Sequence, residues 1–219
     1  MLLASTQKFL KELHRIGAVK VDAKKGFRLA LHDKNPDAPL SPFYINLRTP
    51  DNKDGPLQTA HVESIATELM SAAKRHHIDY DAVAGIPNAG TPLALAVERV
   101  SGMAGTPAEY VHMYKVSPDT REMRAVRWVS GARRVLLVDD LITRADSKLT
   151  AVTALQEAGY EVAGIVVYLD REQGGVRELR RMRIPVFAVL KISEILDFYG
   201  DEKLISKKDL RTIQAYLKQ

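Results

Sequence analysis

Apolar residues recur along the chain in two patterns, which predict strands and helices in turn. Short apolar runs, typical of strands buried on both faces of a parallel sheet, occupy residues 82–85, 135–138, 162–169 and 185–190, and residues 108–111 are predicted to form a further strand. Apolar residues at helical spacing occupy residues 5–16, 57–75, 91–100, 149–155, 192–198 and 207–217. This order predicts an α/β protein with a mainly parallel sheet flanked by helices.

The first 56 residues do not follow this order. Residues 19–21 begin an extended segment, and residues 26–31 are predicted to form a strand. A loop with two prolines then spans residues 32–40. Beyond it, Ile45 and Leu47 alternate with polar neighbours, as in a half-buried strand. The pattern therefore indicates a short N-terminal segment that is distinct from the α/β core.

Two carboxylates, Asp139 and Asp140, follow the apolar run 135–138, at the point where that strand is expected to leave the sheet. Open α/β sheets bind their ligands at this end of their strands, and the amides of a following helix can bind an anion. Adjacent residues of an extended segment point in opposite directions, so one acid can face a ligand while the other faces packed protein. Solvated acids at a strand end are the alternative interpretation, and the pattern alone does not exclude it.

Composition narrows the possible chemistry. The chain has 219 residues and no cysteine, which excludes disulfides, thiolate metal sites and a cysteine nucleophile and suits a reducing cytoplasm. The net charge of +5 favours anionic ligands such as phosphates. The densest basic cluster is expected on a solvated helix face rather than at a nucleic-acid site; it comprises Arg177, Arg180, Arg181 and Arg183. No apolar run approaches the ~20 residues that span a bilayer.

The segment around the two acids resembles the ribose-phosphate signature of the type I phosphoribosyltransferases: a hydrophobic strand, two acids, two apolar residues and a loop that begins with threonine. The resemblance implies that Asp139 and Asp140 act on the sugar. It also implies two substrate-binding loops. The phosphate loop comprises Thr143, Arg144, Ala145, Asp146 and Ser147, and the pyrophosphate loop contains Asn88, Ala89 and Gly90.

Two further segments resemble the orotate phosphoribosyltransferases of that family. Residues 41–48 are similar to their Ser-Pro-aromatic-aromatic segment, which would place Tyr44 and Ile45 beside the pyrimidine base. The sequence Asp-Arg-Glu-Gln-Gly at 170–174 is similar to a turn whose arginine pairs with the orotate carboxylate. The resemblance gives this role to Arg171 and implies that Thr143 helps to hold the ring, and the guanidinium fork suits a carboxylate.

Other positions depart from the family pattern. Ala30 matches a lysine that contacts the diphosphate, and the mobile hood at 112–128 lacks the usual basic pair and histidine. Lys115 is the candidate for a remaining catalytic lysine, although the same residues also suit a solvated hairpin. In the phosphate loop, Arg144, Ala145 and Asp146 stand where the family usually has small residues and glycine. A carboxylate of Asp146 at ~4–6 Å from a phosphate would repel it by roughly 3–4 kcal/mol, unless Arg144 offsets the repulsion or the Asp146 side chain caps the helix or turns away.

The resemblance implies a type I phosphoribosyltransferase fold with an N-terminal helix and hood segment, residues 1–56, and a core at 57–219. The implied enzyme transfers phosphoribosyl from phosphoribosyl diphosphate to orotate, with Lys115, Asp139 and Asp140 as its catalytic residues. Magnesium, Mg2+, would be bound by the substrate, with an acid contributing through water. We expect a cytoplasmic homodimer that binds neither nucleic acid nor membrane. Two alternatives remain: a transferase for another base, and a non-catalytic nucleotide-binding regulator, which the changed loops favour.

Overall fold

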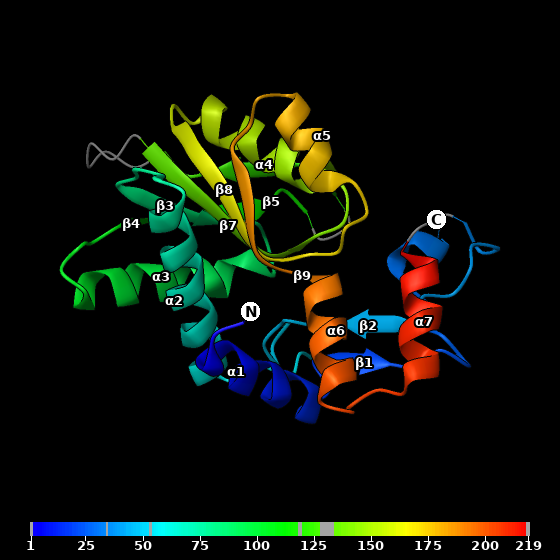
Figure 1. Ribbon diagram of the computed structural model, residues 1–219. Coiled ribbons are helices and arrows are strands. Elements are labelled where there is room, and N and C mark those ends of the chain that lie inside the picture. The colour runs from blue at the N-terminus through cyan, green and yellow to red at the C-terminus, as the bar shows by residue number, and fades with distance from the viewer. Residues whose placement is uncertain (1, 34, 53, 118–119, 128–133, 218–219) are drawn as a thin grey trace.

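The computed structural model describes residues 2–33, 35–52, 54–117, 120–127 and 134–217 (Figure 1). Pro118, Asp119 and Trp128, which belong to the expected hood, lie outside these ranges. Across the described ranges, no helix combines the length and the apolar character that crossing a membrane would require.

A five-stranded parallel sheet forms the centre of the molecule, in the order β4-β3-β7-β8-β9. Its strands are β3 (Ala82–Gly85), β4 (Glu109–Val111), β7 (Arg134–Ile142), β8 (Glu161–Asp170) and β9 (Val186–Lys191). The middle strands are buried on both faces, which explains their continuous apolar runs. The predicted α/β class and parallel sheet are confirmed.

Helices cover both faces of this sheet. Their bounds are α2 (Thr59–Arg75), α3 (Gly90–Met103), α4 (Asp146–Glu157) and α5 (Gly175–Arg181). Leu136 and Val138 of β7 share one hydrophobic core with α2 and α3, whereas Val135 and Leu137 share a second core with α4 and α5. The two cores follow from the alternation of side chains along a strand. Residues next to each other on β7 therefore face different sets of helices.

The chain ends gather beside the sheet as a second group. This group contains α1 (Ala4–Arg15), β1 (Val19–Val21), the 3₁₀ helix η1 (Ala30–Asp33), β2 (Phe43–Ile45), α6 (Ile192–Asp201) and α7 (Lys207–Tyr216). Figure 1 shows the antiparallel β1–β2 ribbon next to α6 and α7. The Tyr199 hydroxyl donates to the Leu10 carbonyl at 2.7 Å, and the rings of Phe43 and Tyr216 meet edge-on at 6.2 Å. The two C-terminal helices therefore pack on the N-terminal segment, and its division from the core at residue 56 stays a prediction.

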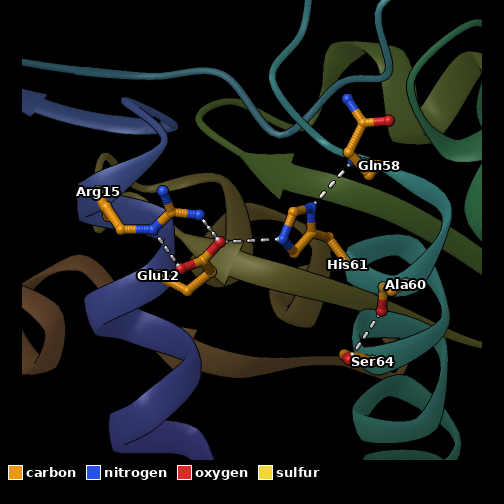
Figure 2. Close-up of polar contacts among 6 residues, drawn as sticks. All are labelled: Glu12, Arg15, Gln58, Ala60, His61 and Ser64. Atoms are coloured by element: carbon orange, nitrogen blue, oxygen red, sulfur yellow. Dashed lines mark hydrogen bonds and ion pairs between the residues drawn. The ribbon is translucent and has the colours of Figure 1, made fainter.

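A polar cluster joins α1 to the start of α2 (Figure 2). Glu12 accepts two hydrogen bonds from Arg15, and its carboxylate lies 3.5 Å from Nε2 of His61. Nδ1 of the same imidazole accepts the backbone N–H of Gln58 at 2.9 Å, which satisfies a helix N-terminal group. This cluster connects the N-terminal segment to the core.

The predicted strand at 26–31 is wrong. Only Phe27 pairs there, as an isolated bridge to Ser41, and the chain then turns into η1. The cause is the buried His32, whose Nδ1 accepts the backbone N–H of Leu29 at 2.9 Å. A local side-chain bond to the backbone competes with strand pairing, and here it closes a turn.

The expectation that the acids follow their strand is also wrong. Strand β7 continues to Ile142, and its late residues Asp139 and Leu141 pair with Val167 and Leu169 of β8. A buried carboxylate is tolerated inside a sheet when it is paired or hydrogen-bonded. The acids therefore lie within the last residues of β7, where the alternation of side chains along the strand fixes the direction of each carboxylate.

The region expected to form the hood contains a separate hairpin. Strands β5 (Met113–Lys115) and β6 (Met123–Ala125) pair in antiparallel register. Met113 and Met123 are buried in the same hydrophobic core as α4, so the hairpin packs on that face of the sheet. Arg121, from the connection between its two strands, donates to Asp146 at the start of α4 at 3.3 Å.

Candidate active site

The two acids of β7 have different surroundings. Oδ2 of Asp139 accepts a hydrogen bond from the Lys148 ammonium at 2.7 Å, and Oδ1 accepts the backbone N–H of Asp140 at 3.0 Å. Lys148 comes from α4, is only 3% exposed and also donates to the Leu141 carbonyl at 2.6 Å. Asp139 is thus part of a buried ion pair on the α4 side of the sheet.

Asp140 points the other way, with Leu136 and Val138. Its Oδ1 accepts the backbone N–H of Leu141 at 2.7 Å, while Oδ2 is buried and has no hydrogen-bond partner among the described residues. Burial and the neighbouring Asp139 raise the pKa of Asp140 to about 7, and the opposing cations are Arg48 and Lys148. A buried carboxyl oxygen without a partner is the kind of group that a ligand satisfies.

The phosphate loop connects β7 to α4. Thr143 and Ser147 are partly exposed, Arg144 is exposed and Ala145 is fully buried. Asp146 begins α4, and its carboxylate is exposed and accepts from Arg121 of the hairpin at 3.3 Å. The structure shows an exposed Asp146 side chain that pairs with a cation and does not cap the helix.

The pyrophosphate loop lies directly against the acids. Asn88 is exposed, Ala89 is partly exposed and Gly90 is buried. A Cβ on Gly90 would lie 2.5 Å from the Val138 carbonyl oxygen and 3.2 Å from Oδ1 of Asp139, so a side chain at this position would displace the loop. Gly90 of the pyrophosphate loop therefore lies against the end of β7, beside Asp139.

Arg171 lies in the turn after β8. Its side chain is 7% exposed, its guanidinium carbon is 5.0 Å from the centroid of the Phe43 ring, and burial lowers its pKa. Nε and Nη2 are buried and have no hydrogen-bond partner in the described chain. The backbone joins this turn to the phosphate loop, because Gly175 N–H donates to the Thr143 carbonyl at 3.2 Å. Arg171 is therefore a buried cation in a turn that is hydrogen-bonded to that loop.

The remaining candidates are placed but not assigned a role by these contacts. Tyr44 is partly exposed and lies 5.9 Å, centroid to centroid, from the ring of Phe27. Ile45 packs in the core, and Lys115 ends β5 with a partly exposed side chain. Their parts in base binding and catalysis stay predictions.

Sequence reasoning missed Lys148, Phe43 and Arg48. A signal for the first was present, because Lys148 shares a helical stripe with the apolar Val152 and Leu155, where a lysine is unusual. For Phe43 the signal was its alternation with Ile45, which places both on one face of β2. Nothing local marks Arg48 as a neighbour of Asp140.

The fold and its strand-end loops define a class of proteins, the type I phosphoribosyltransferases. The crystal structure of orotate phosphoribosyltransferase from Aeropyrum pernix has the same fold, with a TM-score of 0.64 over 88% of this chain and 98% of that chain, at 23% identity. No protein-family model matches the chain.

Relatives in sequence narrow the class. The chain is 32% identical over 179 residues to an orotate phosphoribosyltransferase from Sulfurisphaera tokodaii, covering 81% of this chain and 85% of that protein. It is 29% identical over 215 residues to one from Pyrobaculum aerophilum, covering 96% and 98%. The chain belongs to the orotate phosphoribosyltransferase family.

Proposed function

We propose that this protein is an orotate phosphoribosyltransferase. The ring nitrogen of orotate loses its proton to solvent and forms a bond to C1′ of phosphoribosyl diphosphate, the bond from C1′ to the diphosphate breaks, and orotidine monophosphate and pyrophosphate leave. The observation that carries the proposal is the buried guanidinium of Arg171, whose Nε and Nη2 have no partner in the described part of the chain. A desolvated cation is costly without an anion, and the carboxylate of orotate supplies one with matching geometry. Similarity to enzymes of this name supports the same substrate.

The other groups fit the remaining parts of the substrate. Asp140 offers an unpartnered oxygen to a sugar hydroxyl. The start of α4 offers amide groups to the 5′-phosphate, and the ion pair of Asp146 with Arg121 reduces the repulsion between that carboxylate and the phosphate. Lys115 lies on the hairpin and supplies positive charge for the departing pyrophosphate. Binding thus orients both reactants before the bond forms.

Magnesium fits this arrangement as a partner of the substrate. Mg2+ prefers oxygen ligands and usually binds through one or two carboxylates together with substrate phosphates. The unpartnered Oδ2 of Asp140 is a suitable oxygen, through water or a sugar hydroxyl. When bound, the ion neutralises charge on the leaving diphosphate.

The alternative of a non-catalytic binding protein loses part of its support. Three departures favour it: Ala30 in place of a lysine, the changed hood, and a carboxylate in the phosphate loop. The third is weakened, because Asp146 pairs with Arg121 and is 64% exposed at its side chain. A transferase for a base without a carboxylate would leave Arg171 without a partner.

By resemblance we also propose a homodimer, which light scattering after size exclusion would test.

The decisive experiment is a turnover assay on the purified protein with orotate, phosphoribosyl diphosphate and Mg2+, following pyrophosphate release. Wild-type turnover is expected, and Arg171→Ala should lower kcat/KM for orotate by roughly thirtyfold or more, as expected when a charged hydrogen-bonding partner is truncated. Uracil, which lacks the carboxylate, should lose far less. Arg177→Ala, at an exposed arginine of α5, is the matched control. Equal losses for both bases, or a wild type that does not use orotate, would contradict the assignment.

A further inference from the structure

One of the two acids, Asp139, forms a buried ion pair with Lys148. Their side chains are 7% and 4% exposed, and the ammonium lies 2.7 Å from Oδ2 of the carboxylate. The other oxygen accepts the Asp140 N–H, and the space beside it is closed by Gly90, where a Cβ would come within 3.2 Å. Both oxygens of Asp139 therefore already accept hydrogen bonds from this chain.

Asp140 is in the opposite state. It is 4% exposed, faces away from α4 and keeps one buried oxygen without a partner in the described residues. The charged groups around it are Asp139, Arg48 and Lys148, which come from three different segments. Of these, Arg48 belongs to the N-terminal segment, so this acid faces the side on which that segment meets the sheet.

Lys148 also connects the two elements on either side of the phosphate loop. It starts from the first turn of α4, and its ammonium donates to the Leu141 carbonyl near the end of β7 at 2.6 Å. One side chain thus joins the strand before the loop to the helix after it. A hydrophobic side chain at this buried position would avoid the desolvation free energy that a paired charge costs, so packing alone does not explain a lysine here.

We propose that Lys148 is a positioning residue of the transfer reaction. It holds Asp139 in an internal ion pair at the base of the phosphate loop and leaves Asp140 as the acid that accepts the sugar hydroxyls. This inference rests on the proposed function, because it takes phosphoribosyl diphosphate as the ligand. Of the two adjacent aspartates, Asp139 then has a structural role and Asp140 binds the substrate.

The test compares Asp139→Asn, Lys148→Met, the double variant and Asp140→Asn. For each, calorimetry with phosphoribosyl diphosphate and Mg2+ gives the affinity, turnover gives kcat and KM, and the melting temperature reports folding. Each change to the pair made alone leaves a buried charge without its partner and should weaken binding roughly tenfold or more. The double variant removes both charges and should bind at least roughly tenfold more tightly than the weaker single variant.

Asp140→Asn should lose roughly ten- to hundredfold in affinity while melting no lower than the pair variants, and adding Lys148→Met should not rescue it. Lys148→Arg keeps a charged donor and should bind better than Lys148→Met. Lys74→Met removes an exposed lysine of α2 and serves as the control for loss of charge. A role limited to folding would lower melting temperatures without this pattern in KM and affinity.

Two results would overturn the division. One is a double variant that binds phosphoribosyl diphosphate as weakly as Asp139→Asn, which is expected if Asp139 itself contacts the sugar. The other is an Asp140→Asn variant that binds phosphoribosyl diphosphate as tightly as wild type. If wild type binds phosphoribosyl diphosphate but does not use orotate, the proposed function fails and the calorimetric series still decides between the acids. If wild type does not bind phosphoribosyl diphosphate, both proposals fail.

Discussion

Replacing Asp140 with asparagine should stabilise the unliganded protein increasingly as the pH rises. Its pKa is raised from 3.8 to about 7, mainly by burial. Between these values the native state binds more protons at this site than the unfolded chain does. The free energy of unfolding therefore falls as the pH increases from about 4 to about 7. Below the lower value the acid is protonated in both states, and this contribution disappears.

The size of the effect follows from the shift. About three pKa units at 1.36 kcal/mol each correspond to about 4 kcal/mol at pH 8, which is an upper limit for a carboxyl that lies beside a second charge, Asp139. Asparagine has no charge to desolvate, but its amide nitrogen also lacks a partner, at a cost of about 1–3 kcal/mol at every pH. The diagnostic quantity is thus the change in the stability difference between pH 4 and pH 8.

The measurement is urea denaturation of wild type and Asp140→Asn over this pH range, without ligand or Mg2+. Asp37→Asn, at an exposed loop acid, is the control and should show no such trend. The variant should gain stability relative to wild type at high pH and yet have much lower turnover. A stability difference that is the same at pH 4 and pH 8 would refute the reasoning.

Three further substitutions test the rest of the site. Arg171→Met should leave the unliganded protein at least as stable in urea, because it removes a buried cation, while the KM for orotate rises; lost stability with an unchanged KM would contradict this. Asp146→Asn should change stability by less than about 1 kcal/mol and affinity for phosphoribosyl diphosphate only slightly by calorimetry, because the carboxylate is exposed and paired with Arg121. Tenfold tighter binding would show that it faces the phosphate. Gly90→Ala places a Cβ 2.5 Å from the Val138 carbonyl oxygen and should cost about 1–3 kcal/mol in urea denaturation and weaken substrate binding, whereas Gly102→Ala, with open space around it, should not destabilise.

Much of the architecture could be predicted because its signals are local. Burial on both faces requires continuous apolar runs, so the core strands and their order with the helices followed from the sequence. Loop positions followed as well, because parallel strands end at one edge of the sheet. The prediction failed at 26–31, where a buried imidazole, rather than an apolar pattern, decides the backbone.

The division of work within the site required the tertiary structure. Sequence alone showed two adjacent acids, a misplaced carboxylate in the phosphate loop and an arginine after a strand. Only the packed chain decided that Asp139 meets Lys148, that Asp146 turns to Arg121, and that Arg171 lies over Phe43. These partners come from separate elements of the fold, and apolar periodicity reports whether a residue is buried but not which charge it will meet.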